Sequence, residues 1–173
     1  MSGSTRRIAR GALVATLAAV VFVPRLGAQA NGETIGGISC DAQEGQRMHI
    51  HQHLVIFDKG KEVAIPKNVG QPATKPCIYW LHTHTPDGII HIEAPMNRSF
   101  TLGDFFKVWG QPLSRTQAAT AGAGMGPALK VWVNGKVFTG DPATIPLVAH
   151  ADIVIMSGPP FVKPPVFTAW GKL

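Results

Sequence analysis

The segment spanning residues 80–95, "WLHTHTPDGIIHIEAP", alternates polar and apolar residues on both sides of a Pro-Asp-Gly turn. Residues two apart on a strand point to the same face of a sheet, so this alternation predicts two antiparallel strands with one polar and one apolar face. The polar face would carry His82, His84, His91 and Glu93. Sheet structure is therefore the first constraint on the fold.

A four-residue turn at 85–88 sets the expected register of these two strands. Proline suits the second position of such a turn, and Asp and Gly suit the third and fourth. His82 then lies opposite His91, and Trp80 lies opposite Glu93. A three-residue bulged loop would instead turn His91 into the core. Because a slip of one residue moves every side chain to the other face, the hydrophobic pattern favours the four-residue turn.

A second histidine-rich segment, "MHIHQHLVIF" at residues 48–57, follows the same alternation. Its three histidines share one face of the predicted strand, and most of its aliphatic residues share the other. Six of the seven histidines of the chain therefore fall in two short segments. Cross-strand Cβ atoms lie about 5 Å apart, which lets neighbouring imidazoles hold one ion through bonds of about 2.1 Å.

The two segments together predict a site for a divalent transition metal, zinc or copper, with iron less favoured. Glu93 can serve there as a further ligand, as an anchor for a histidine, or as a base. The strand at 48–57 completes the same site or forms a second one. The candidate ligands are His82, His84, His91 and Glu93, joined by His49, His51 or His53.

Two other interpretations of the histidines stay open, namely a pH-sensitive cluster and a solvated polar face. A single H-x-H on a strand is more often structural than metal-binding. Several crowded imidazoles are harder to explain without a ligand, because they desolvate one another and repel when protonated. Metal binding is therefore favoured. His150 stands alone at a strand start and is expected to be structural.

Residues 1–30 have the features of a cleavable signal peptide. Three arginines precede an apolar run of thirteen residues, and Ala28-Gln29-Ala30 supplies a small-x-small cleavage pattern. Thirteen helical residues rise only about 20 Å, short of the roughly 30 Å hydrocarbon core, so an uncleaved membrane anchor is the weaker interpretation. The sequence leaves the export route open. The mature protein is expected to be periplasmic or extracellular, with no stable membrane span.

Removal of this leader changes the charge balance of the chain. The leader holds four of the 16 basic residues and none of the ten acidic ones, so the formal net charge falls from +6 to about +2. No basic stripe with interleaved aromatic residues remains, which leaves nucleic-acid binding without support.

Both cysteines lie in the exported part, where an oxidising compartment lets disulfides persist. A Cys40–Cys77 bridge is the favoured prediction. The alternative, Cys77 as a thiolate ligand of the metal, is weaker because the expected strand register places Cys77 on the face opposite the histidines.

The remaining elements complete one α+β domain with a mostly antiparallel sheet. Lys59-Gly60 and Asn134-Gly135 predict two further hairpins, and "SFTLGDFFKVWGQP" predicts one short capped helix. The order of elements is similar to a β-grasp, with a β-sandwich or a cupin-like barrel as alternatives. The expected divisions are an irregular lead-in at 31–47, the metal-binding domain at 48–157 and an extended Pro-rich tail at 158–173.

The runs "HIHQHLVIF", "YWLHTHTPDGIIHIEAP" and "FTLGDFFKVWGQPL" together resemble a family of uncharacterised exported bacterial proteins. That family shares an L-H-T-H…G-I-I-H-[IV]-E core and an F-T-L-G-x-F-F-x-x-W-G segment. The resemblance spans about residues 48–155 and implies export, with no particular activity. Cupin dioxygenases also use an H-x-H, a Glu and a further His. Here, however, His91 precedes Glu93, and the usual intervals and glycines are missing.

Three functions follow from these patterns. The favoured one is a metal-binding module whose partner is the ion itself, with any protein partner left open. The second is a small metalloenzyme, a hydrolase or an oxidoreductase, in which Glu93 is the general base. The third is a secreted structural domain without metal. Nucleophile elbows, phosphate loops and Cys-x-x-Cys motifs are absent from the sequence.

Overall fold

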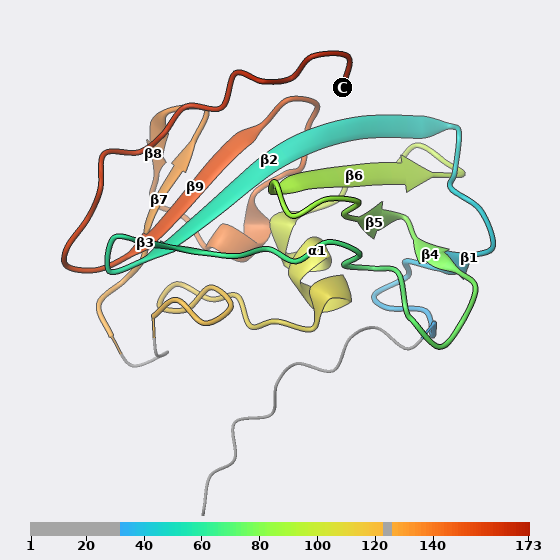
Figure 1. The fold of residues 1–173 in the computed structure, drawn as a ribbon, viewed down its shortest axis with the longest axis horizontal. Coiled ribbons are helices and arrows are strands. Elements are labelled where there is room, and N and C mark those ends of the chain that lie inside the picture. The colour runs from blue at the N-terminus through green and yellow to red at the C-terminus, as the bar shows by residue number, and fades with distance from the viewer. Residues whose placement is uncertain (1–31, 123–125) are drawn as a thin grey trace, which may run out of the picture.

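The longest strand, β2 (Met48–Asp58), runs through the middle of a seven-stranded sheet in the computed structural model, which describes residues 32–122 and 126–173. β6 (Ile89–Ala94) pairs with it in antiparallel fashion on one side, and β9 (Asp152–Ser157) pairs in parallel on the other. All other strand pairs are antiparallel. The expected α+β class with a mostly antiparallel sheet is confirmed (Figure 1).

The strand order across this sheet is β5-β6-β2-β9-β7-β8, with β3 added at the end of β2. A separate two-stranded sheet pairs β1 with β4. The remaining elements are β1 (Cys40–Asp41), β3 (Lys61–Val63), β4 (Ile78–Tyr79), β5 (Leu81–His82), α1 (Leu102–Trp109), β7 (Lys130–Val133), β8 (Lys136–Phe138), and the short 3-10 helix η1 (Pro142–Thr144).

The two predicted tight hairpins form where the turn residues allow them. Asn134 and Gly135 both adopt positive φ angles, 51° and 73°, between β7 and β8. Lys59 and Gly60 do the same between β2 and β3, at 49° and 79°. A two-residue turn with both φ angles positive matches the right-handed twist of the flanking strands, so it joins them without splaying them apart.

The helix α1 begins and ends at the predicted residues. The Thr101 side chain accepts a hydrogen bond from the Asp104 amide and the Asp104 side chain accepts one from the Thr101 amide, which makes a capping box. Gly110 ends the helix in the left-handed conformation. The helix lies on one face of the sheet, which we call the inner face (Figure 1). The buried side chains of the helix belong to the main hydrophobic core. These side chains are Leu102, Phe105, Phe106, Val108 and Trp109.

The strand expected before the Pro-Asp-Gly turn is divided at Trp80 into β4 and β5. Tyr79 pairs with Cys40 of β1, whereas Leu81 pairs with Ile92 of β6, so the chain changes partners between β4 and β5. The segment expected as an irregular lead-in therefore contains one short strand. The Cys40–Cys77 disulfide is present, as predicted, and closes the end of this small sheet.

The tail at 158–173 contains no helix or strand, which agrees with its proline content. It runs back over the outer face of the sheet, the face opposite α1 (Figure 1). The Phe167 ring stacks on His53 with ring centroids 4.0 Å apart, and Trp170 stacks on His150 at 4.7 Å. These ring contacts hold the tail in place.

The predicted signal peptide at 1–30 lies outside the described residues. Within the part of the chain that the structure describes, no helix combines the length and the apolar character needed to cross a bilayer.

Candidate metal centre

The sheet register places three imidazoles in one row across three adjacent strands. His51 of β2 pairs with His91 of β6, and His91 pairs with His82 of β5. In the next row, His49 lies opposite Glu93. The predicted pairing of His82 with His91 is confirmed. This register forms because it is the one that buries the aliphatic residues of the same strands on the inner face.

The connection after β5 differs from the predicted four-residue turn, although the register is the same. Regular pairing stops at His82 because the backbone of Thr83 bonds to the loop before β4. The Thr83 amide donates to the Val69 carbonyl at 3.1 Å, and the Asn68 amide donates to the Thr83 carbonyl at 2.9 Å. With the chain held there, the His84 ring lies against that of His82, with centroids 4.7 Å apart.

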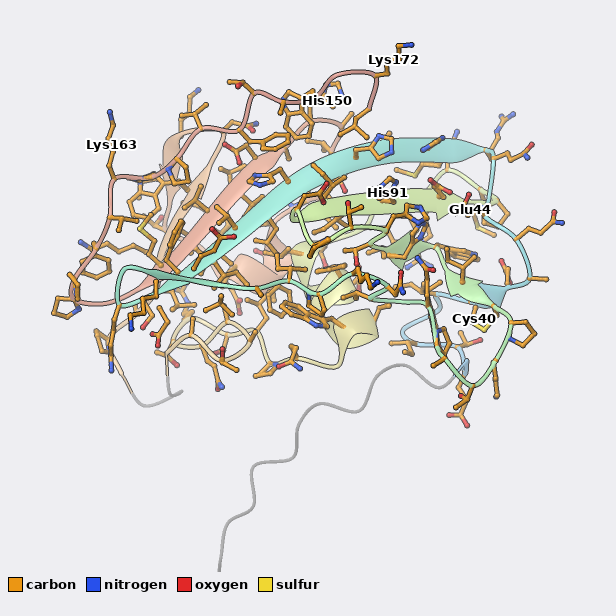
Figure 2. All side chains as sticks on the ribbon, viewed as in Figure 1. Cys40, Glu44, His91, His150, Lys163 and Lys172 are labelled. Atoms are coloured by element: carbon orange, nitrogen blue, oxygen red, sulfur yellow. A yellow bond between two sulfur atoms is a disulfide. The ribbon has the colours of Figure 1, made fainter. Side chains whose placement is uncertain are left out.

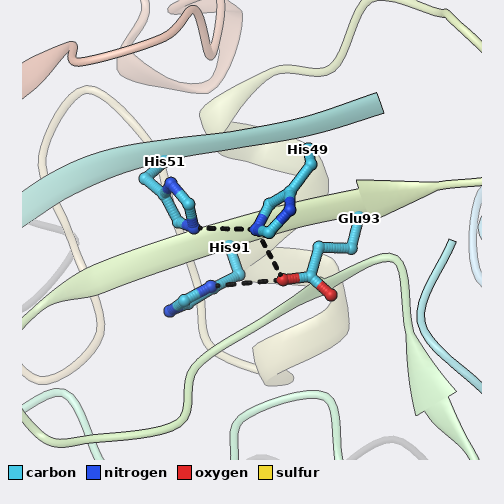
Figure 3. A group of neighbouring side chains, drawn as sticks. All are labelled: His49, His51, His91 and Glu93. Atoms are coloured by element: carbon cyan, nitrogen blue, oxygen red, sulfur yellow. Dashed lines mark hydrogen bonds and ion pairs between the residues drawn. The ribbon is translucent and has the colours of Figure 1, made fainter. Parts of the chain in front are cut away.

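One group of potential ligands, the β2 group, consists of His49, His51, His91 and Glu93 (Figure 3). Nε2 of His49 lies 3.1 Å from Nε2 of His51 and 3.0 Å from Oε1 of Glu93. One potential ligand atom from each residue lies within 4.8 Å of the others. Four ligand atoms around one tetrahedral ion lie about 3.4 Å apart, so small side-chain rotations would close this group on a metal.

A second group, the β5 group, consists of His82, His84, His91 and Glu93, and meets the same distance limit. Nε2 of His82 lies 3.1 Å from Nε2 of His84. On its other side, Nδ1 of His82 donates to the Tyr79 carbonyl at 2.9 Å. Because a carbonyl oxygen only accepts, this bond fixes the proton on Nδ1 and leaves Nε2 with a lone pair aimed at the site.

Glu44 is a further carboxylate at the site that sequence reasoning missed. Its Oε1 lies 3.5 Å from Nε2 of His84 and 3.9 Å from Nε2 of His82, and its carboxyl is hydrogen-bonded to that of Glu93. Figure 2 shows Glu44 at the same end of the sheet as His91. Gly45 lets the loop approach the end of β6, because a Cβ there would overlap the Ala94 backbone. A lone acid in an irregular Gly-rich segment carries no periodic signal that could reveal this position.

Burial determines the protonation of the cluster. Desolvation lowers the pKa of His82 to about 4 and that of His91 to about 3, and neighbouring histidines lower the pKa of His91 further. The pKa of His51 is lowered for the same reasons. Burial, followed by the hydrogen bond that protonated Glu93 donates to the Glu44 carboxylate, raises the pKa of Glu93 to about 7. The buried imidazoles are therefore neutral at pH 7, which is the form that binds a metal.

His91 is the least satisfied member of the cluster. Its Nδ1 is buried and makes no hydrogen bond among the described residues. It lies 3.4 Å from Oε1 of Glu93, but without the geometry of a hydrogen bond. A buried ring nitrogen without a donor or acceptor costs free energy, and a metal ion is one partner that would remove this cost.

A cavity of about 430 Å³ adjoins both groups. It is lined by the loop 43–46 together with His49 and Glu93. The side chains of His49 and His84 are 57% and 41% exposed, whereas that of His82 is fully buried. Solvent and small solutes therefore approach the cluster from the side of His49, His84 and the cavity.

His53 is the one candidate ligand that the structure places outside both groups. Its Nδ1 lies 2.9 Å from Oδ1 of Asp152 at the start of β9, and its ring is covered by Phe167. His150 also lies apart, as expected. Its ring stacks on Trp170, and its Nε2 lies 2.9 Å from the carbonyl oxygen of Leu173.

Comparison of the chain with known protein families, curated proteins and solved structures finds no match. The resemblance to a family of exported proteins therefore stays a prediction. What the site can do has to be inferred from its own geometry.

Proposed function

We propose that this chain is an exported protein that binds a divalent transition metal, zinc or copper, through the imidazoles on the outer face of its sheet. The observation that carries the proposal is the presence of two groups of three histidines and one glutamate, each with all ligand atoms within 4.8 Å. Both groups share His91 and Glu93.

The chemistry of the donors supports zinc or copper over other ions. Imidazole nitrogen is a common ligand of zinc and copper, whereas calcium and magnesium prefer shells made of oxygen. The ligands are also arranged in advance, because β-sheet pairing fixes His51, His82 and His91 in one row. The bond from His82 to the Tyr79 carbonyl is the kind of outer contact that orients metal-binding histidines.

Two other features support export of the protein and a β-grasp-like fold. The Cys40–Cys77 disulfide is suited to an oxidising compartment, which agrees with export after removal of residues 1–30. The strand order β6-β2-β9-β7-β8, with α1 on one face and a parallel central pair, supports a β-grasp-like architecture for residues 48–157. The metal-binding row then occupies the face that the helix leaves uncovered.

Elemental analysis of the mature protein purified from the periplasm of an expressing bacterium tests the proposal. We expect zinc or copper in stoichiometric amount in the wild type, and its loss in His91→Ala, because His91 belongs to both groups. His150→Ala is the matched control and should retain the metal. A wild-type protein that stays free of metal after incubation with zinc and with copper, followed by gel filtration, would contradict the proposal.

A metalloenzyme is the second candidate, and the cavity of about 430 Å³ next to the ligands favours it. Glu93 borders that cavity, and its raised pKa suits a group that accepts a proton near neutral pH. Activity would be assayed as hydrolysis of an activated aryl ester by the zinc-loaded protein and as oxygen consumption by the copper-loaded protein. If Glu93→Gln keeps the metal and loses turnover, Glu93 is a base. If it loses the metal, Glu93 is a plain ligand.

A further inference from the structure

The donors around the site outnumber what a single ion uses. A structural zinc ion binds four ligands, and a catalytic one binds three from the protein. Seven side chains with suitable atoms surround this site. They are His49, His51, His82, His84, His91, Glu93 and Glu44.

These donors are arranged as two pairs with shared residues between them. The His49–His51 and His82–His84 pairs each bring two Nε2 atoms to 3.1 Å. Among the described residues, no group that meets the distance limit contains both pairs. Atoms bound to one ion at about 2.1 Å lie at most about 4.2 Å apart, so one ion does not use both pairs in this arrangement.

His91 and Glu93 lie between the pairs and have the atoms to bridge them. The His91 ring centroid is 4.5 Å from that of His51 and 4.4 Å from that of His84. A carboxylate has two oxygens that can bind one ion each. An imidazole can do the same through its two nitrogens once the ring N–H proton has been released to solvent, which makes His91 an imidazolate. We propose that the site holds two divalent metal ions, one at each histidine pair, bridged by His91 and Glu93. This inference rests on the proposed function.

The charges around the site support two metal positions and indicate that a small anion is bound with the ions. Each pair has a carboxylate close by, since Glu93 Oε1 lies 3.0 Å from His49 and Glu44 Oε1 lies 3.5 Å from His84. Two divalent ions nevertheless carry more positive charge than two carboxylates and the His91 imidazolate neutralise. The cavity of about 430 Å³ is lined by Glu44, His49 and Glu93, which come from both positions. A small anion such as hydroxide would fit there and balance the remaining charge.

The number of zinc ions bound per chain distinguishes a two-ion site from a one-ion site and from a protein that binds no metal. Mature apo protein, prepared by dialysis against a chelator, is loaded with excess zinc, passed through a desalting column and measured for metal content. We expect two zinc ions per chain. One ion per chain would overturn the two-ion inference and leave the proposed function standing. No bound ion would overturn both.

Paired variants assign each ion to its ligands. His49→Ala/His51→Ala should retain one zinc ion, held by the β5 group. His82→Ala/His84→Ala should likewise retain one, held by the β2 group. His53→Ala/His150→Ala removes two histidines that lie outside both groups and should retain two. Retention of two ions by both test variants would show that the ligands lie elsewhere and overturn the inference.

A spectroscopic measurement on the wild type covers the case in which a variant fails to fold. In protein loaded with two copper(II) ions, a shared bridge couples the two unpaired electrons. We expect an electron paramagnetic resonance signal that integrates to much less than two spins or shows a half-field transition. Two full, independent copper(II) signals would overturn the bridged arrangement.

Discussion

The two halves of β2 present opposite chemistry on the same outer face of the sheet. The first half carries His49 and His51, which lie among the other candidate ligands. The second half carries Val55 and Phe57, which pack with Trp132, Val154 and Met156 in a small apolar cluster. We call these the histidine end and the apolar end.

The neighbouring strands account for the difference between the two ends. At the histidine end β2 pairs with β6, which brings His91 and Glu93 opposite its own imidazoles. At the apolar end it pairs with β9, which brings Val154 and Met156. Alternation along one strand determines which side chains share a face, and the partner strand determines what they do together. Each end can therefore be perturbed without the other.

The largest effect expected from a single substitution comes from the apolar end. Met156 is 1% exposed, so Met156→Ala should lower the free energy of unfolding by about 2–5 kcal/mol through lost burial and a new cavity. Urea unfolding of the apo protein measures this change. Zinc content should equal that of the wild type, because no candidate ligand lies in the apolar cluster. A parallel loss of zinc would show that the two ends are coupled.

Zinc should stabilise the protein through the histidine end alone. At a free zinc concentration one hundred times the dissociation constant, the free energy of unfolding should rise by about 2.7 kcal/mol per site. Thermal unfolding with zinc and with chelator measures the shift. His91→Ala should abolish this stabilisation by zinc. Met156→Ala should show the same stabilisation by zinc as the wild type, although its apo form is less stable. An equal zinc shift in His91→Ala would refute the assignment of the site.

Acid should destabilise the apo protein, and the effect should come from the histidine end. The pKa of His82 is lowered from 6.5 to about 4 and that of His91 to about 3, so below pH 6.5 the unfolded chain binds protons that the folded chain excludes. This contribution to stability is present above pH 6.5 and is lost as the pH falls toward 4. Glu93 acts in the opposite direction, because its raised pKa lets the folded state hold a proton between pH 7 and 4.5.

The destabilising effect of acid on the histidines should exceed the stabilising effect on Glu93, because the pKa of His51 is lowered as well. We therefore expect a net loss on the order of 1–2 kcal/mol between pH 7 and 4.5, after allowance for solvent screening. Urea unfolding at both pH values, in the presence of chelator, measures it. The double variant His82→Phe/His91→Phe should have a flatter profile. A wild-type stability that rises toward pH 4.5 would contradict this balance.

His53 lies at the boundary between the two ends and should give the smallest effect. We expect His53→Ala to lower the free energy of unfolding by about 1 kcal/mol, because it removes the contacts with Asp152 and Phe167. Its zinc content should be unchanged. Loss of one zinc ion in this variant would place His53 among the ligands and move the boundary.

The features that the sequence predicted correctly depend on local patterns. The register of His82 and His91 follows from alternation on both strands, because any slip would expose Ile92. The Asn134-Gly135 hairpin and the Thr101 capping box follow from the conformational preferences of a few consecutive residues.

The features that it did not predict depend on partners distant in the chain. His53 continues the spacing of His49 and His51, but its imidazole is hydrogen-bonded to Asp152, which lies 99 residues away in the chain. Glu44 reaches the cluster because its loop crosses the end of β6, which no pattern within the loop indicates. The division of the histidines into two groups likewise depends on the pairing of β5 with β6, which places His82 beside His91.

The disulfide has a consequence for how the centre is assembled. Cys40 precedes Glu44 by four residues and Cys77 precedes His82 by five, so this single covalent link holds together the starts of two segments that supply donors. A chain kept reduced would have to bring these segments together without that tether. We therefore expect the reduced chain to bind the proposed metal ions more weakly than the oxidised chain.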